Sequence, residues 1–163
     1  MRRCGLQAVT VVSAVVLLPW AVAAEKQRPP EEGEFKISYA GHEIGNERYL
    51  LAISGDSAES TSLLSFRNPQ DARQSIRLET KLSMNGRFTP RSYELKSNVD
   101  GRNGIILGKF SPNQVIFEYG GAGTGARRGL LVGDQYTILD TNVFHHFIFL
   151  ARLFLEEGKG KAG

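Results

Sequence analysis

The sequence predicts a mainly β protein, an antiparallel curved sheet or half-barrel with one apolar helix at its C-terminus. Short segments of alternating polar and apolar residues recur roughly every ten residues, with Gly, Asn, Asp and Pro between them. The pair Asn85-Gly86 lies between two such segments and is typical of a β-hairpin turn. Residues 143–155 contain neither Gly nor Pro and are rich in apolar side chains, which indicates a helix.

The composition fits a single globular domain. The chain has 163 residues, of which 41% are hydrophobic and 23% are charged, so it is long enough to bury one core and too apolar to be wholly disordered. Its single cysteine, Cys4, excludes an intramolecular disulfide and a CxxC zinc site.

Residues 1–24 are typical of a secretory signal peptide. Arg2 and Arg3 form a positive start, residues 9–18 are almost wholly apolar, and residues 21–24 are small enough for a cleavage site. An uncleaved N-terminal anchor is the alternative, but the apolar run is short for a membrane span. We therefore expect a periplasmic or secreted bacterial envelope protein.

Removal of the signal would leave a nearly neutral domain. Two arginines and no acidic residue would be lost, so 18 basic residues would face 17 acidic ones, a net charge of +1. Such a domain lacks the basic surface that nucleic-acid binding requires, and we expect no nucleic-acid partner.

The first elements follow from alternation along the chain. Residues 25–34 are polar and contain two adjacent prolines, which predicts a flexible lead-in to a single β-rich domain at 35–155. Apolar residues at every second position predict strands at 35–39 and 49–53, and a weaker strand at 62–66.

The hairpin around Asn85-Gly86 allows its register to be predicted. A two-residue turn there pairs Met84 with Arg87 and then Leu78 with Tyr93. The same counting pairs Ile76 with Leu95 and Arg77 with Glu94. The side chains of the polar face are expected in solvent, and they are those of Arg77, Glu79, Lys81, Glu94 and Lys96.

Residues 105–110 and 115–119 are predicted to form a further hairpin, in which Phe110 faces Val115 and Ile106 faces Tyr119. Both faces of this hairpin are apolar, because Ile105, Leu107 and Ile116 occupy the reverse face. We therefore expect the helix, a partner or a ligand to cover the second face. A glycine-rich loop at 120–129 and short strands at 130–132 and 136–139 complete the β region.

The predicted helix spans residues 143–155 and follows oxygen-bearing side chains at 140–142 that suit an N-cap. Gly158 is expected to end it. A last core strand is the alternative. A polar tail at 156–163 follows. Two apolar stripes are expected to be buried, one of Val143, Phe147, Leu150 and Phe154 and one of Phe144, Ile148, Ala151 and Leu155.

His145 and His146 are the pair of residues that most suggests metal binding or catalysis. Neighbouring helical residues point about 100° apart, so they do not easily share a metal ion. We expect no metal site, but one partly buried and one exposed histidine, bonded to backbone or to an acid. Asp140 is either an N-cap or a general acid or base.

The glycine-rich segment contains a GxGxxA pattern at residues 121–126. A dinucleotide site needs a helix after this pattern, whereas a strand-like run follows, and the P-loop lysine is absent. We therefore expect no cofactor and interpret the segment as a hairpin tip. Arg127 and Arg128 on that tip are expected to contact an anionic headgroup or simply to be solvated.

Three segments carry a family resemblance: residues 39–49 (YAGHEIGNERY), 88–93 (FTPRSY) and 138–146 (ILDTNVFHH). They resemble an uncharacterised exported bacterial β-rich family of the domain-of-unknown-function class. The resemblance implies a half-barrel-like sheet, distantly like envelope lipid and lipoprotein carriers, and no established activity. Such proteins usually continue with further strands, so a shortened or truncated member is expected, with an open sheet edge that needs a partner strand or a homodimer.

These observations favour a binding module for an apolar or lipid-like ligand, without enzymatic activity. The alternatives are an envelope structural or assembly protein without a ligand and, ranked last, a hydrolytic enzyme that uses Asp140 with His145 or His146. The residues expected to line a ligand cavity, or else to form plain core, are Ile106, Phe110, Phe117, Tyr119 and Phe147.

Overall fold

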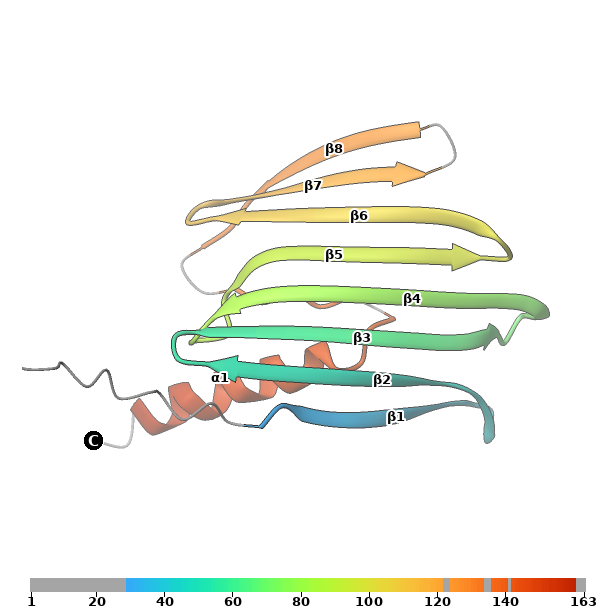
Figure 1. The fold of residues 1–163 in the computed structure, drawn as a ribbon, viewed down its shortest axis with the longest axis horizontal. Helices are drawn as coiled ribbons and strands as arrows, with labels where there is room; N and C mark the ends of the chain where they lie inside the picture. Colours follow the sequence, from blue (N-terminus) through green and yellow to red (C-terminus); the bar gives the residue numbers. More distant parts are fainter. Residues whose placement is uncertain (1–28, 122–123, 134–135, 141, 161–163) are drawn as a thin grey trace, which may run out of the picture.

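The computed structural model describes residues 29–121, 124–133, 136–140 and 142–160. They form one eight-stranded antiparallel sheet, in which each strand pairs with the next along the chain, and one helix (Figure 1). The sheet is curved and unclosed, because β1 and β8 are its two free edges. This confirms the predicted fold class. The expected signal peptide, residues 1–24, lies outside the described residues.

The elements have the following bounds. The strands are β1 (Glu31–Tyr39), β2 (His42–Ser54), β3 (Ser57–Asn68), β4 (Asp71–Asn85), β5 (Pro90–Val99), β6 (Arg102–Ser111), β7 (Gln114–Gly121) and β8 (Thr124–Leu131). The helix is α1 (His146–Gly160). No helix among the described residues is both long and apolar enough to cross a membrane.

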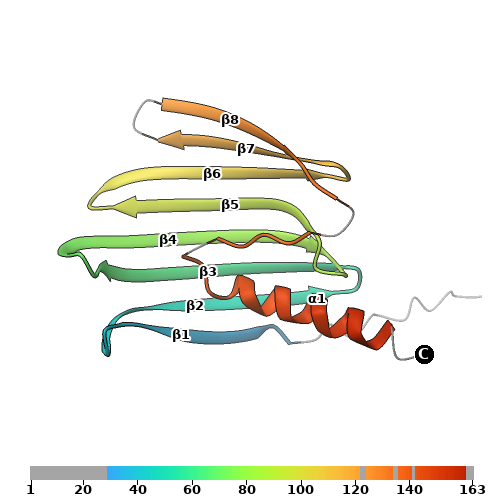
Figure 2. The same ribbon diagram turned by 180° about the vertical axis from the view of Figure 1, so that it is seen from behind.

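The core lies between one face of the sheet and α1. We call this the inner face; α1 lies over its β1–β3 half, behind the sheet in Figure 1 and in front of it in Figure 2. Every second side chain of the central strands points to the inner face, as the alternation predicts. The buried apolar residues include Leu51, Leu64, Leu82, Met84, Tyr93, Leu95 and Phe149.

The sheet begins earlier than expected, within the predicted lead-in. Glu31 pairs with Leu51 of β2, and Glu34 pairs with Arg48, so residues 31–34 are strand rather than flexible chain. Glu34 accepts hydrogen bonds from Asn46 and Arg48, which lowers the pKa of its carboxyl group. These polar contacts extend the edge strand beyond the apolar stripe from which its start was predicted.

The predicted register of the β4–β5 hairpin is wrong. Tyr93 faces Leu82 rather than Leu78, Leu95 faces Thr80 rather than Ile76, and Met84 pairs with Pro90 rather than Arg87. The remaining pair is likewise displaced, since Glu94 lies opposite Lys81 instead of Arg77. Because the displacement is an even number of residues, every side chain keeps its predicted face.

A longer loop at residues 85–89 explains this displacement. The side-chain oxygen of Asn85 accepts the N–H groups of Arg87 and Thr89, each at 2.9 Å. Phe88 adopts a positive φ of 59° and is buried, with its ring 6.1 Å from that of Phe149 in α1. The loop is therefore shaped by contact with the helix, which a two-residue turn would not allow.

The β6–β7 hairpin has the predicted register, with Phe110 opposite Val115 and Ile106 opposite Tyr119. The described residues of the glycine-rich segment are strand, because residues 120–121 end β7 and Thr124–Leu131 form β8. Arg127 and Arg128 therefore lie within β8 rather than on a hairpin tip. The residues predicted as a strand at 130–132 largely end β8, and 136–139 form no strand.

The helix begins later and ends later than predicted, at His146 and Gly160. The two predicted stripes are buried only in part: Val143 is buried as predicted, and Phe144, Ile148 and Leu150 are half-buried. Phe147, Phe154 and Leu155 are exposed, whereas His145, His146 and Phe149, which belong to neither stripe, are buried. The prediction of one exposed histidine is therefore wrong. A buried carboxylate of β2, described below, holds the histidine side of α1 against the sheet.

Candidate functional site

An apolar part of the inner face lies beyond the helix, over β6, β7 and β8. Four of the five residues predicted to line a ligand cavity lie together here. Ile106 pairs with Tyr119, the rings of Phe110 and Phe117 are 6.0 Å apart, and those of Phe117 and Tyr119 are 6.3 Å apart. Leu130 of β8 extends this surface opposite Val115. We call Ile106, Phe110, Phe117, Tyr119 and Leu130 the β6–β8 face.

The β6–β8 face is covered only in part. Tyr136, from the segment that returns toward the helix, stacks on Phe110 with ring centroids 6.0 Å apart. Ile106 and Phe117 are half-buried, while Tyr119 and Leu130 are 39% and 42% exposed. Because α1 lies over the opposite half of the sheet (Figure 2), apolar side chains of this face remain open to solvent.

The fifth residue predicted to line a ligand cavity, Phe147, lies in α1 and not on the sheet. It is the second residue of α1 and is 53% exposed. The ring contacts that join the aromatic residues of the sheet do not include it, as far as the described residues go. Phe147 is thus not part of the β6–β8 face.

The two arginines predicted to contact an anionic headgroup occupy opposite faces of β8. Arg128 is opposite Phe117 and therefore shares the inner face, whereas Arg127 is opposite Glu118 on the outer face. Glu118 also lies 3.7 Å from Lys109, so the outer position is one of mixed charge. Within the described part of the chain Arg128 has no ion-pair partner, and its side chain is exposed.

A second cluster is polar and buried, and it holds the residues that sequence analysis considered for catalysis. Glu47 of β2 accepts the N–H groups of Phe144 and His145 at 2.7 and 3.2 Å through Oε2. Its Oε1 is 2.6 Å from Nδ1 of His145. Both side chains are fully buried. Glu47 thus binds the turn from which α1 begins, the role that the sequence assigned to Asp140.

Asp140 instead contacts β5. The hydroxyl of Tyr93 donates to Asp140 at 3.2 Å, and Asp140 also accepts the N–H of Asn142. Burial, followed by the charge of Asp140, raises the pKa of the Tyr93 hydroxyl well above its usual range. Asp140 is therefore not the cap of α1, but it orders the segment that leads to it.

The histidine pair is inaccessible. The rings lie 4.6 Å apart and both are fully buried, and the Nε2 atoms of His145 and His146 have no hydrogen-bond partner among the described residues. Burial, with a smaller effect of His145, lowers the pKa of His146 to about 3, so this imidazole is neutral at pH 7. The described residues contain no group of three or more side chains placed to bind a metal ion.

Sequence reasoning missed Glu47, although a signal was present. In β2 an acidic residue occupies the same alternating series as Tyr49, Leu51 and Ile53. A carboxylate in an apolar series must find a partner, because an unpaired buried charge is very costly. The partner, 98 residues away, is not evident from the sequence.

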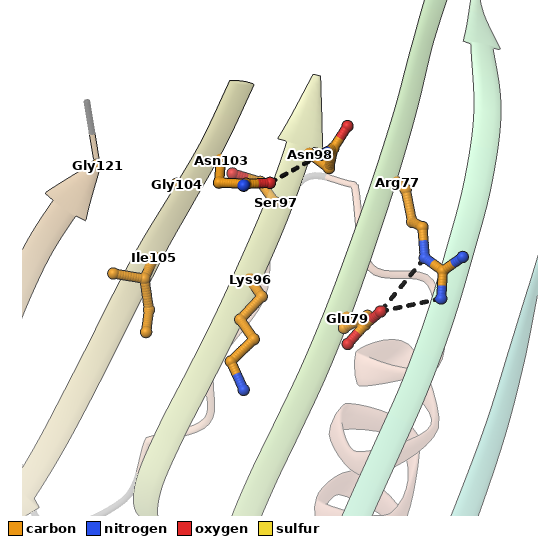
Figure 3. A pocket seen from close by; sticks show the side chains of 9 residues that line it. All are labelled: Arg77, Glu79, Lys96, Ser97, Asn98, Asn103, Gly104, Ile105 and Gly121. Atoms are coloured by element: carbon orange, nitrogen blue, oxygen red, sulfur yellow. Dashed lines mark hydrogen bonds and ion pairs between the residues drawn. The ribbon is translucent and has the colours of Figure 1, made fainter. Parts of the chain in front are cut away.

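The outer face of β4 and β5 is polar, as predicted. A shallow groove of about 570 Å³ lies there, lined by residues that include Arg77, Glu79, Lys96 and Asn98 (Figure 3). Arg77 binds Glu79 at 3.0 Å, and Asn98 donates to Asn103 at 2.7 Å. These polar groups satisfy one another, which is typical of a solvated sheet face.

The geometry therefore offers one surface suited to a ligand and one buried cluster suited to holding the helix. Comparison with protein-family models, curated proteins and solved structures finds no match for this chain. The β6–β8 face, with Arg128 at its margin, is the arrangement from which a function can be argued.

Proposed function

We propose that this chain is an exported envelope protein that binds an apolar, lipid-like molecule on the β6–β8 face. The observation that supports the proposal is the set of partly exposed apolar side chains that converge there, at the end of the inner face not occupied by α1. Apolar surface of this kind gains free energy when a ligand removes it from water, roughly 25 cal/mol per Å². The expected signal at residues 1–24 supports the envelope location.

The first experiment identifies what the protein holds. The chain is exported in a bacterial host, purified without detergent, denatured, extracted with organic solvent, and analysed by mass spectrometry. A lipid present in about stoichiometric amount supports the proposal and identifies the ligand class. A folded protein without any such molecule contradicts it for the lipids of that host.

Two variants test whether the ligand occupies this surface. Tyr119→Glu places a charge on the β6–β8 face, where Tyr119 is 39% exposed. Leu63→Glu is the matched control, because Leu63 is 37% exposed and belongs to the outer face of β3. We expect Tyr119→Glu to release the co-purifying lipid and Leu63→Glu to retain it. Equal retention by both variants would contradict the assigned surface.

The alternative is an envelope structural or assembly protein without a ligand. It is favoured by the two free sheet edges and by the exposed Phe147, Phe154 and Leu155 of α1. A ligand-free protein that sediments as a dimer, or that joins a partner strand, would support this reading.

A hydrolytic enzyme remains the least supported function. Its expected residues are Asp140, His145 and His146, and both histidines are fully buried. A general base must reach the proton that it abstracts, directly or through one water molecule.

A further inference from the structure

We propose that the ligand of the β6–β8 face is an anionic amphiphile, an apolar chain with one carboxylate or phosphate, and that Arg128 binds its charged end. This inference rests on the function proposed above. It adds the chemical class of the ligand and the residue that selects it.

The first step of the argument is the register of β7 and β8. Residues directly opposite each other in an antiparallel pair have Cβ atoms about 5 Å apart on the same face. Arg128 is opposite Phe117, whose ring belongs to the β6–β8 face. Its neighbours on that face are Ala126, opposite Tyr119, and Leu130, opposite Val115. Arg128 is therefore a cation among apolar positions.

The second step is the contrast with Arg127. Side chains of adjacent residues in a strand point to opposite faces, so Arg127 is directed to the outer face beside Glu118. The outer face is generally ion-paired, as Lys109 with Glu118 and Lys96 with Glu94 illustrate. In the described part of the chain neither Arg127 nor Arg128 makes an ion pair, but only Arg128 lies on the apolar face, opposite Phe117 and without an acid opposite it. A charged group of the ligand can take this place.

The third step is the chemistry of arginine. Its aliphatic stem lies readily on apolar surface while the guanidinium stays in water. The planar guanidinium donates two parallel hydrogen bonds to a carboxylate or a phosphate. A ligand that places its chain on Phe117 and Tyr119 and its anion at Arg128 uses both properties. An uncharged lipid would use only the first.

The test measures binding of three probes with the same chain, each kept below the concentration at which it forms micelles. Oleate carries a carboxylate, oleoyl lysophosphatidic acid carries a phosphate, and oleyl alcohol is uncharged. Affinities are determined for the wild-type chain, for Arg128→Gln and for Arg127→Gln, by competition with a fluorescent fatty acid. The urea midpoint of each variant verifies that it is folded.

We expect Arg128→Gln to weaken binding of one or both anionic probes roughly threefold to tenfold, the range for a charge-assisted contact at an exposed site. Binding of oleyl alcohol is expected to stay unchanged, and Arg127→Gln to leave all three affinities unchanged. The anionic probe that loses more affinity in Arg128→Gln shows whether Arg128 prefers a carboxylate or a phosphate. In about 1 M salt, where the Debye length is about 3 Å, the wild-type preference for the anions should shrink.

The outcomes separate the two proposals. If Arg128→Gln and Arg127→Gln behave alike, or if the alcohol binds as tightly as both anions, the anionic ligand is overturned while the apolar site stands. If none of the three probes binds the folded wild-type chain, the proposed function fails and the inference fails with it.

Discussion

Glu47 and His145 form a hydrogen bond of 2.6 Å between Oε1 and Nδ1, with both side chains fully buried, although 98 residues separate them in the chain. The same carboxylate accepts two backbone N–H groups at the start of α1. A carboxyl group on the inner face of β2 thus determines where the helix begins and which side of it meets the sheet.

Replacement of Glu47 should therefore detach the helix. Glu47→Ala removes three hydrogen bonds and leaves a buried imidazole and two N–H groups without partners. We expect the free energy of unfolding to fall by about 3–5 kcal/mol, which is the usual cost of removing one partner of a buried pair and leaving the other unpaired. Urea denaturation followed by circular dichroism measures it.

Glu59→Ala is the control for that change. Glu59 lies in β3 on the outer face, exposed and 3.7 Å from Lys81. Its loss should alter the free energy of unfolding by less than about 1 kcal/mol. Equal effects of the two replacements would refute the assigned role of Glu47.

His146 should make the protein sensitive to acid. Its pKa falls from 6.5 to about 3 in the folded chain, chiefly through burial, so the unfolded chain binds a proton that the folded chain does not. The stabilisation is complete above pH 6.5 and is lost as the pH falls toward 3. The loss approaches about 1.4 kcal/mol per pH unit in that window.

The measurement is the urea midpoint at several values between pH 7 and pH 4. His146→Leu should reduce the slope of stability against pH, because the titrating imidazole is gone, whereas His42→Leu should not, because His42 is exposed. An unchanged slope in His146→Leu would contradict the assignment of the acid sensitivity to His146.

The β4–β5 loop should depend on the side chain of Asn85. Asn85→Ala removes the acceptor of two backbone N–H groups, at Arg87 and Thr89, and we expect a loss of about 1–2 kcal/mol. Asn113→Ala, in the exposed turn between β6 and β7, is the control and should change little. Thermal unfolding compares the two. A neutral Asn85→Ala would favour the two-residue turn that the sequence suggested.

Ser62 and Thr80 should behave as a coupled pair. Their hydroxyls are 2.8 Å apart in the buried interior, on directly opposite positions of β3 and β4. Thr80→Val leaves the Ser62 hydroxyl without its partner and should cost about 1–3 kcal/mol. The double variant Ser62→Ala/Thr80→Val should be more stable than the sum of the single changes predicts, as a double-mutant cycle by urea denaturation would reveal. Additive changes would show that the two hydroxyls do not interact.

The local sequence pattern was sufficient to predict much of the sheet and part of the candidate site. Alternation assigned the faces of β4 and β5 correctly even though the register was displaced, because a strand repeats every two residues. Counting from the short turn between β6 and β7 predicted the correct partners of Ile106 and Phe110. It therefore placed four of the five expected ligand residues together. The separation of Arg127 from Arg128 follows from the same alternation once β8 is recognised as a strand.

By itself, then, the sequence determined the strand periodicity, the polar outer face of β4 and β5, and the apolar surface of β6 and β7. Only the tertiary structure decided the β4–β5 register, the burial of both histidines and the exposure of Phe147. Each of these depends on a contact between residues far apart in the chain, Phe88 with Phe149 in the first case and Glu47 with His145 in the others. A local pattern records which side chains avoid water, but it does not record which distant partner makes a buried polar group stable.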